Sequence, residues 1–284
     1  MPLTNRYNLP KPLVSAVEWK WYTKAGHISA TSLLKSPRQR WLQERHHADI
    51  QEDASDRIWA LLGSAVHAIL ERQTADNHLT EERLWGVVNG WTVTGQADVL
   101  SEDMTLSDYK VTSVYSFLLD DKAEWEQQLN VYAWLYRHSG FDVKRAQIVA
   151  ILRDWSKRKS EMESDYPPVP VMVKTIPVWT LDEQRAFVEA RVAAHQSTES
   201  LADDALPLCT DAERWASSTV FALMRGKAKR AVRLFQSREE AERALAHAVD
   251  RADMRIDERP GQARRCESYC TAAPWCSQWK AEQS

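Results

Sequence analysis

The sequence lacks any long apolar run and any targeting segment of a usual kind. None of its segments offers the roughly 18 continuous apolar residues of a membrane span, and residues 1–20 have no continuous apolar stretch like that of a secretory signal. Internal repeats and low-complexity tracts are missing as well. We therefore expect no membrane attachment and a cytoplasmic location. In a reducing cytosol, disulfides are a poor explanation for the four cysteines.

The chain also lacks a basic excess, because its formal net charge is −3. Its 284 residues, 44% hydrophobic and 27% charged, are typical of an ordinary globular protein with one large or two small domains. A nucleic-acid-binding protein need not be basic overall if its basic residues are grouped. Smaller basic groups occupy residues 37–41 and 153–159, and the largest lies in 224–235, without an acidic residue: Arg225, Lys227, Lys229, Arg230 and Arg233. Phosphate contact and a solvated surface both stay open for them.

Two β-type segments around Asp98 and Asp108 predict a pair of adjoining strands. The polar turn 101–104 between them can close a β-hairpin. With that turn at the centre, antiparallel pairing puts Asp98 opposite position 107 or 108. Asp108 and Lys110 stand two residues apart on one strand, so their side chains share a face.

These three side chains have the chemistry of a metal-assisted phosphodiester hydrolase. Two carboxylates close together repel each other unless a cation lies between them, and Mg²⁺ prefers such hard oxygen ligands. An ammonium group beside the ion can neutralise the charge that develops on a phosphate. The alternative is a solvated strand face, on which charged residues commonly alternate, and a D-x-K tripeptide alone does not decide between the two.

A helix is predicted over residues 55–74, before these strands. Ser55 can cap its N-terminus, and apolar residues recur along it at helical spacing. Gly63, His67 and Glu71 follow at intervals of four, so they line one stripe of the helix. A glycine inside a helix costs about 1 kcal/mol relative to alanine, which indicates that something approaches this face closely. His67 could then reach a metal ion or a scissile phosphate; a surface histidine is the alternative.

The dipeptide Asn89-Gly90, between two apolar-rich segments, predicts another tight hairpin, because these residues tolerate positive φ angles. The chain then runs directly into Asp98, which predicts three antiparallel strands in a row. Farther along, the proline-rich residues 164–179 predict a loop and an edge strand.

Residues 120–140 predict a second helix, which Gly140 terminates. Gln128 and Tyr132 lie one turn apart on it, on a stripe next to its apolar side. A buried strand then follows and ends at Arg153. The expected order is therefore helix, three strands, helix and strand.

Four short motifs, taken in this order, resemble those of the RecB-like branch of the PD-(D/E)XK nuclease superfamily: Gly63-x3-His67, Asp98, Asp108-x-Lys110 and Gln128-x3-Tyr132. Each motif is short, but all four in sequence on the expected secondary structure make a specific signal. The resemblance covers about residues 29–155. It implies an α/β fold with a restriction-endonuclease-like core in residues 1–180, in which helices flank a central mixed sheet.

The resemblance also implies the activity and the metal. It implies a deoxyribonuclease that depends on Mg²⁺ or Mn²⁺ and acts as an exonuclease on DNA ends or single strands. The ion would be held by Asp98, Asp108 and the backbone carbonyl of Tyr109, and His67 would join this metal site.

The remaining motif residues receive catalytic roles from the same resemblance. Lys110 would orient or activate the attacking water. Gln128 and Tyr132 would organise the site or contact DNA. Glu71 and Arg153 are additional candidates by their position. A phage or prophage origin, with the cytoplasm of a bacterial host as the location, and a recombinase or helicase partner also follow from the resemblance.

Three of the cysteines, Cys266, Cys270 and Cys276, form a C-x3-C-x5-C pattern, and Cys209 is the distant fourth. Four thiolates suffice for a zinc ion or a 4Fe–4S cluster. Zinc ribbons and fingers usually pair their ligands in two close knuckles, so this layout favours iron–sulfur over zinc or no metal. Several RecB-like nucleases close their C-terminal end with such a cluster. Their lone cysteine lies early in the chain, where this sequence has Ser36.

Residues 181–284 are expected to form a helical region packed on the core, rather than an independent domain. Three S/T-x-x-E patterns mark helix starts in it: Thr180/Glu183, Thr210/Glu213 and Ser237/Glu240. A cluster that joined Cys209 to residues 266–276 would tie this region shut, which is a structural role.

Two other classes of function stay open on the sequence alone. A catalytically silent DNA-binding subunit of a recombination or repair complex could keep the fold without cleaving. The intact Asp98, Asp108 and Lys110 argue against it, because a decayed site would be expected to lose one of them. An iron–sulfur or zinc protein with a redox or regulatory role would leave those three residues unexplained.

Overall fold

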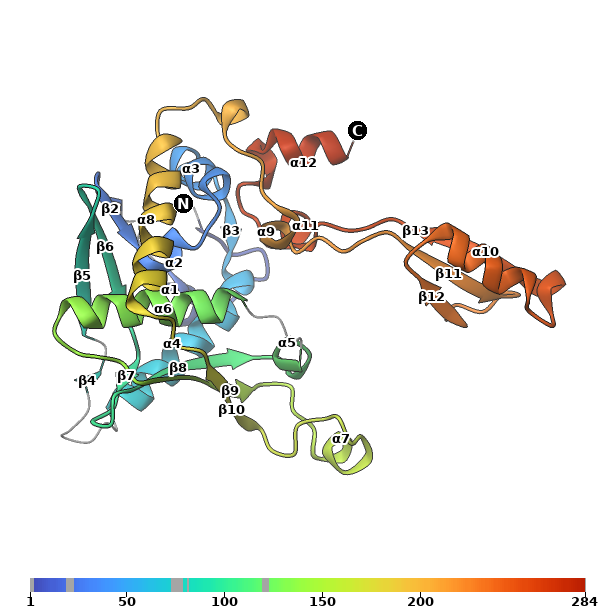
Figure 1. Ribbon diagram of the computed structural model, residues 1–284, viewed down its shortest axis with the longest axis horizontal. Helices are drawn as coiled ribbons and strands as arrows, with labels where there is room; N and C mark the ends of the chain where they lie inside the picture. Colours follow the sequence, from blue (N-terminus) through green and yellow to red (C-terminus); the bar gives the residue numbers. More distant parts are fainter. Residues whose placement is uncertain (1–2, 19–22, 73–78, 81, 119–122, 284) are drawn as a thin grey trace.

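The computed structural model describes residues 3–18, 23–72, 79–80, 82–118 and 123–283 (Figure 1). Its strands are β1 (Leu3–Thr4), β2 (His27–Ser29), β3 (Glu52–Asp53), β4 (Leu79–Thr80), β5 (Arg83–Val88), β6 (Trp91–Gln96), β7 (Val99–Leu100), β8 (Thr105–Thr112), β9 (Arg145–Leu152), β10 (Val171–Ile176), β11 (Val220–Arg225), β12 (Arg233–Phe235) and β13 (Met254–Arg259). Its α-helices are α1 (Lys11–Val17), α2 (Ala30–Leu33), α3 (Pro37–Arg45), α4 (Ile58–Glu71), α5 (Val114–Leu118), α6 (Ala123–His138), α7 (Lys157–Met162), α8 (Leu181–Ser197), α9 (Asp211–Arg214), α10 (Arg238–Ala246), α11 (Arg264–Ser268) and α12 (Ser277–Glu282). Short 3-10 turns are η1 (Ala54–Arg57), η2 (Asp203–Ala205), η3 (Arg251–Asp253) and η4 (Ala273–Trp275).

The main sheet is mixed, with five strands in the order β10-β9-β8-β7-β4. β8 and β9 are parallel, with Asp108 opposite Ile148, whereas the other three pairs are antiparallel. Parallel neighbours need a long crossover, and α6 supplies it between β8 and β9. β10 lies at an edge of the sheet, after the proline-rich loop, as the prolines predicted. The predicted mixed sheet flanked by helices is therefore confirmed.

A second sheet, β2-β6-β5, contains the hairpin that Asn89-Gly90 predicted, and these two residues have φ angles of 49° and 79°. The prediction of three antiparallel strands in a row is wrong, because the chain changes sheets between β6 and β7. Near this change of sheet, the carboxylate of Asp98, rather than a backbone carbonyl of a paired strand, accepts the N–H of Tyr109.

Helix α6 packs on both sheets and forms the centre of the main core. Its end agrees with the prediction, since Gly140 follows it with a φ of 90°; the predicted start, residues 120–122, lies outside the described residues. Two strand glycines allow the close contact of the helix with the β2-β6-β5 sheet. A Cβ atom on Gly86 would lie 2.6 Å from the ring of Trp134, and one on Gly95 would lie 2.6 Å from Leu135. Any side chain there would push α6 away.

The helix predicted over residues 55–74 divides into η1 and α4, and residues 73–74 lie outside the described part. Ser55 is not its cap. The buried Asp53 begins η1 and accepts hydrogen bonds from Ser55 and, across β1–β3, from Thr4. None of the described residues would lie within 4 Å of a Cβ atom on Gly63. The described part of the protein therefore does not make the predicted close approach to Gly63.

Residues 181–283 contain several helices and also a sheet that the sequence did not predict. Capping boxes begin α8 at Thr180 and α9 at Thr210, whereas Ser237 at α10 makes one of the two bonds of such a box. Between α9 and α11, the antiparallel sheet β12-β11-β13 and helix α10 form a unit, residues 220–259, with a small core of its own. Figure 1 shows this arm, as we call it, standing away from the other two sheets.

The chain then returns from the arm to the main body. Ala272 and Cys276 are buried in the main core, and Trp275 and Trp279 pack against it. Residues of α8 and of 264–283 thus belong to or pack against the main core, whereas the arm has a core of its own. No helix within the described residues is long and apolar enough to cross a membrane.

Candidate active site

The turn between β7 and β8 brings the two predicted carboxylates together. Val99 pairs with Ser107, so one further step of the register puts Asp98 opposite Asp108, as predicted. Oδ2 of Asp98 accepts the N–H of Tyr109 at 2.6 Å. The N–H and C=O of one strand residue point to the same side of the strand. The carbonyl of Tyr109 therefore points to the side of β8 on which Asp98 lies.

Asp108 and Lys110 share a face of β8, and α6 covers that face. The Nζ atom of Lys110 lies 2.7 Å from Oδ2 of Asp108 and donates to Oε1 of Gln128 at 3.0 Å. The amide nitrogen of Gln128 lies 2.9 Å from the hydroxyl of Tyr132 and 3.4 Å from Oδ1 of Asp108. The residues predicted from two motifs far apart in the sequence thus form one connected network.

His67 reaches this network from α4, with its Nδ1 atom 2.9 Å from Oδ1 of Asp98. Glu71 and Gly63 line an open groove along α4 together with His67. Arg153 lies elsewhere: its guanidinium stacks over the ring of Trp59, 4.5 Å from the ring centre. Arg153, just after β9, therefore lies against Trp59 of α4, and Glu71 lies on the groove beside His67.

Burial and neighbouring charges set the protonation of the network. Burial raises the pKa of Asp108, and the ammonium of Lys110 opposes this shift. The hydrogen bond to Asp98 raises the pKa of His67. Burial raises the pKa of Tyr132 to about 12, so this side chain is a neutral hydroxyl at pH 7. The ammonium of Lys110 thus lies against the carboxylate of Asp108, and the imidazole of His67 lies against that of Asp98.

Cys209 and the three C-terminal cysteines, Cys266, Cys270 and Cys276, line one enclosed cavity of about 20 Å³. Cys276 is buried and the other three are half-buried, and all four are free thiols. Burial raises the pKa of Cys209 to about 11 and also raises the pKa values of Cys266 and Cys270. In the described residues, however, no group of three or more His, Cys, Asp or Glu side chains is arranged to hold a metal ion.

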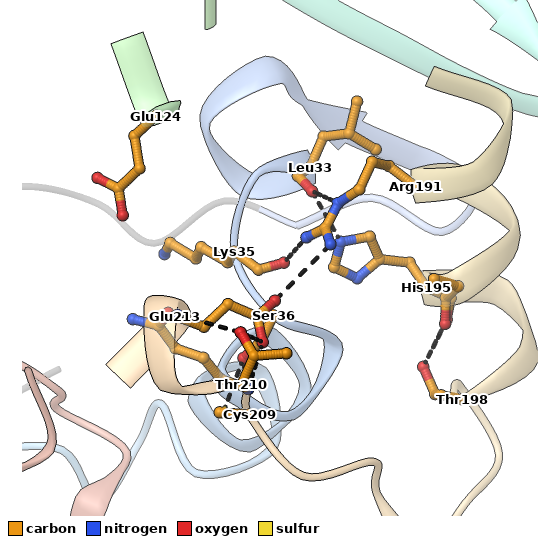
Figure 2. Close-up of polar contacts among 12 residues, drawn as sticks. Leu33, Lys35, Ser36, Glu124, Arg191, His195, Thr198, Cys209, Thr210 and Glu213 are labelled. Atoms are coloured by element: carbon orange, nitrogen blue, oxygen red, sulfur yellow. Dashed lines mark hydrogen bonds and ion pairs between the residues drawn. The ribbon is translucent and has the colours of Figure 1, made fainter. Parts of the chain in front are cut away.

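Ser36 contacts Cys209, which lines this cavity, with 3.1 Å between their Oγ and Sγ atoms. Figure 2 shows how α8 holds the segment before Ser36 in place. Arg191 donates to the carbonyl of Leu33 at 3.0 Å and also to that of Lys35, and Nε2 of His195 lies 3.1 Å from the same Leu33 oxygen. Cys209 therefore lies beside Ser36, at the start of α3.

Arg38 is a residue of this region that the sequence interpretation missed. Its side chain is 1% exposed and donates to the carbonyls of Leu206 and Pro207, just before Cys209. It also donates to Ser277 at 3.1 Å, next to Cys276. The sequence predicts either phosphate contact or a solvated surface for the basic group in residues 37–41, and for Arg38 both predictions are wrong. No sequence pattern distinguishes a buried arginine from an exposed one within such a group.

A model of the PD-(D/E)XK nuclease superfamily matches residues 74–277 of the chain. The matched part begins after His67 and includes Asp98, Asp108, Lys110 and all four cysteines. Because the match covers more than half of the sequence, the chain belongs to the PD-(D/E)XK nuclease superfamily. A search of the curated proteins found no match.

Solved structures similar to this chain include that of SSO0001, at 19% identity and a TM-score of 0.46. The similarity covers 64% of this chain and 83% of that one. An alkaline exonuclease from Laribacter hongkongensis has 14% identity and a TM-score of 0.40, covering 67% and 94%. A phage-related exonuclease from Haemophilus somnus 129PT has 16% identity and a TM-score of 0.30, covering 58% and 72%. At such TM-scores these likenesses say nothing about the substrate or the mode of cleavage.

Proposed function

We propose that this chain is a divalent-metal-dependent deoxyribonuclease, an exonuclease that hydrolyses phosphodiester bonds in DNA. One observation carries the proposal: Asp108, Lys110 and Gln128 form one network of contacts, next to the Asp98–His67 pair. A solvated strand face would not explain it, because Asp108 is only 3% exposed. The intact set of Asp98, Asp108 and Lys110 argues against a silent DNA-binding subunit, because a decayed site would be expected to lose one of them.

The donor atoms of this site suit Mg²⁺ or Mn²⁺. The candidate ligands are Asp98, Asp108 and the carbonyl of Tyr109, which are hard oxygen donors, and His67. A buried carboxylate in contact with a single ammonium also fits a cation site. Magnesium is usually held by one or two carboxylates and keeps several waters, so a cage of three side chains is not required. When bound, the ion would supply a Lewis acid for the phosphoryl oxygen and lower the pKa of a water.

The protein's own groups would position the reactants and stabilise charge. Lys110, fixed between Asp108 and Gln128, would place its ammonium where negative charge develops on the phosphate. Gln128 would hold that ammonium in place. Tyr132, a neutral hydroxyl, would orient Gln128 or donate a hydrogen bond to DNA. Glu71, on the groove along α4, would lie beside the DNA rather than on the reacting phosphate.

Substitution of the network tests the proposal. Asp108→Ala and Lys110→Ala are expected to abolish cleavage of linear DNA in Mg²⁺ or Mn²⁺, and EDTA to abolish cleavage by the unsubstituted protein. Asp103→Ala is the matched control, because Asp103 lies in the turn before β8 and pairs with Arg145 at the surface. Undiminished cleavage by both network variants would exclude this active site.

The exonuclease mode and the preference for ends or single strands are supported by the motif resemblance. DNA labelled separately at each end tests them. An exonuclease releases one label at once and the other only after full digestion, and the order gives the polarity. An endonuclease would instead leave each label on a fragment of intermediate length. It would also cut circular DNA as readily as linear DNA.

We propose further that Cys209, Cys266, Cys270 and Cys276 hold a 4Fe–4S cluster, with zinc as the alternative. Their three-plus-one spacing and their shared cavity support this assignment. The small cavity and the absence of a preformed metal-binding group in the described residues mean that the thiols must move apart and deprotonate to bind it. Anaerobic purification should yield brown protein that absorbs near 400 nm; a colourless protein with one zinc ion per chain would contradict it.

A phage or prophage origin, a bacterial cytoplasm as the location and a recombinase or helicase partner are supported by the resemblance alone. Free thiols are consistent with a reducing compartment. Co-purification of the chain, expressed at its native level, with a recombinase or helicase would support the partner; recovery of the chain by itself, in active form, would contradict it.

A further inference from the structure

The loop between β11 and β12, at residues 226–232, is held firmly at its base. Arg225 pairs with Asp250 at 3.2 Å, and the N–H of Gly226 donates to the carbonyl of Asp253 at 2.7 Å. Arg255 donates to the carbonyl of Gly226. Gly226 has a φ of 47°, and a Cβ atom there would lie 3.2 Å from the Asp253 carboxylate, so the tight base favours glycine. The rest of the loop is therefore presented outward on a fixed support.

Beyond this base, the loop presents positive charge that the protein does not neutralise. Lys227, Lys229 and Arg230 are exposed, and none of them forms an ion pair within the described part of the chain. The arm carries ten Lys and Arg and seven Asp and Glu, a formal net charge of +3, whereas the whole chain carries −3. The rest of the chain therefore has a net charge of −6.

This separation of charge bears on how an acidic protein can hold DNA. A body with a net charge of −6 repels the phosphate backbone at long range, so attraction must come from a local positive region. The arm stands away from the sheet that carries Asp108 (Figure 1). Its lysines and arginine are therefore placed to contact DNA at a distance from the reacting phosphate, rather than to take part in the chemistry.

We propose that the arm is a second DNA-binding element, which grips the phosphate backbone through Lys227, Lys229 and Arg230 and holds long DNA on the enzyme. The proposal rests on the proposed nuclease function for the identity of the ligand. The grip is electrostatic and independent of sequence, because flexible lysines on a loop contact phosphates and do not read bases. Short DNA that fits the active site alone would not reach the arm.

Binding of a long duplex by the full chain in EDTA, measured by fluorescence anisotropy at several salt concentrations, tests the proposal without cleavage. The variant is Lys229→Gln combined with Arg230→Gln. Each lost phosphate contact lowers the slope of log K against log salt by about 0.9, so we expect a slope lower by about 2 and affinity at least about ten-fold weaker near 0.1 M salt.

The matched control is Arg238→Gln combined with Arg243→Gln. It removes the same charge from the same arm, but on α10, where Glu239, Glu240 and Glu242 surround the arginines. The control should keep the slope, and both variants should cleave a short single strand at the unsubstituted rate. Equal slopes for the loop variant and the unsubstituted protein would overturn the proposal, as would an equal loss in the control. If the unsubstituted protein cleaves nothing yet binds through the loop, the proposed function fails and the arm's role stands.

Discussion

Lys110 is held from two sides, by the carboxylate of Asp108 and by the side-chain oxygen of Gln128. Gln128 is thus a positioning residue for the ammonium. Its replacement by alanine should leave the fold intact, because the side chain is only partly buried. We expect kcat for DNA cleavage to fall about 100-fold, since misplacement of a catalytic group by about 1 Å has effects of that order.

Gln147→Ala is the matched control, because this glutamine bonds Ser107 on the other face of β8, at 2.9 Å. It should leave kcat nearly unchanged. Steady-state kinetics of the two variants give the comparison. Equal rates for Gln128→Ala and the control would remove Gln128 from the site.

His195 gives a prediction about pH that does not involve the active site. It is fully buried, and burial lowers its pKa to about 4. In the unfolded chain the pKa is about 6.5, so the unfolded state binds the proton more readily and stability is lost as the pH falls from about 6.5 to 4. This one residue should lower the free energy of unfolding by about 3 kcal/mol over that range.

His195→Gln removes this titration and keeps a donor near the Leu33 carbonyl. Urea unfolding of both proteins at several pH values between about 4 and 7 measures the difference. The variant should lose less stability in acid than the unsubstituted protein. Parallel curves would mean that the histidine is not buried in its neutral form.

At the scale of elements, the contact of α6 with β5 positions one wall of the site. Gly86→Ala would drive a Cβ atom to 2.6 Å from the buried Trp134. Overpacking of this kind costs about 1–3 kcal/mol of unfolding free energy. Thermal unfolding should therefore give a lower Tm, and activity should fall with it if α6 shifts.

Gly63→Ala on α4 is the opposite case. No described residue would lie within 4 Å of the new methyl group, and alanine is the better helix former, so stability should rise by up to about 1 kcal/mol. A loss of stability in Gly63→Ala, or none in Gly86→Ala, would contradict this account of the packing. Strong inhibition by Gly63→Ala without destabilisation would instead indicate that DNA passes along this face of α4.

Elements with a local signal could be predicted from the sequence. Asn89-Gly90 encodes its own turn, and the spacing of Asp108 and Lys110 follows from the two-residue period of a strand. Gln128 and Tyr132 could be placed one turn apart because helical periodicity is equally local. The resemblance to the family motifs then predicted that these residues lie together in one site.

What could not be predicted depends on distant contacts. At the break between β6 and β7, the side chain of Asp98 accepts the N–H of Tyr109 on β8. The start of η1 is capped by Asp53, which also accepts a hydrogen bond from Thr4. In the sheet of the arm, β11 buries three consecutive residues, Ala222, Leu223 and Met224, and β12 has only three residues, so the apolar–polar alternation typical of a strand is missing there. Arg38 lies in a basic group that resembles a surface, and only the tertiary structure buries it.

At the scale of the whole molecule, the cysteine cavity joins the early helix α3, the segment before α9 and the C-terminal residues. Ser36 and Cys209 lie close enough for either position to supply the same ligand. Cys209→Ser should therefore lose most of the bound iron or zinc, and adding Ser36→Cys to it should restore the metal. Metal analysis and the absorbance near 400 nm measure both.

If the folded double variant, with Cys209→Ser and Ser36→Cys, binds no more metal than Cys209→Ser alone, a thiol at position 36 cannot replace the thiol at position 209. Retention of the full metal content by Cys209→Ser alone would remove Cys209 from the ligand set. A variant with Ser32→Cys, on the neighbouring helix α2, controls for the mere addition of a thiol.

The central claim is that two carboxylates and Lys110 cleave DNA with a divalent ion. The most direct measurement is the initial rate of cleavage of linear DNA by the unsubstituted protein and by Asp108→Asn, each with Mg²⁺, Mn²⁺ or EDTA. Asparagine keeps the shape of Asp108 and removes its charge. We predict cleavage by the unsubstituted protein with either metal, none in EDTA and none by Asp108→Asn. Cleavage by Asp108→Asn at the unsubstituted rate, or cleavage in EDTA, would contradict the account.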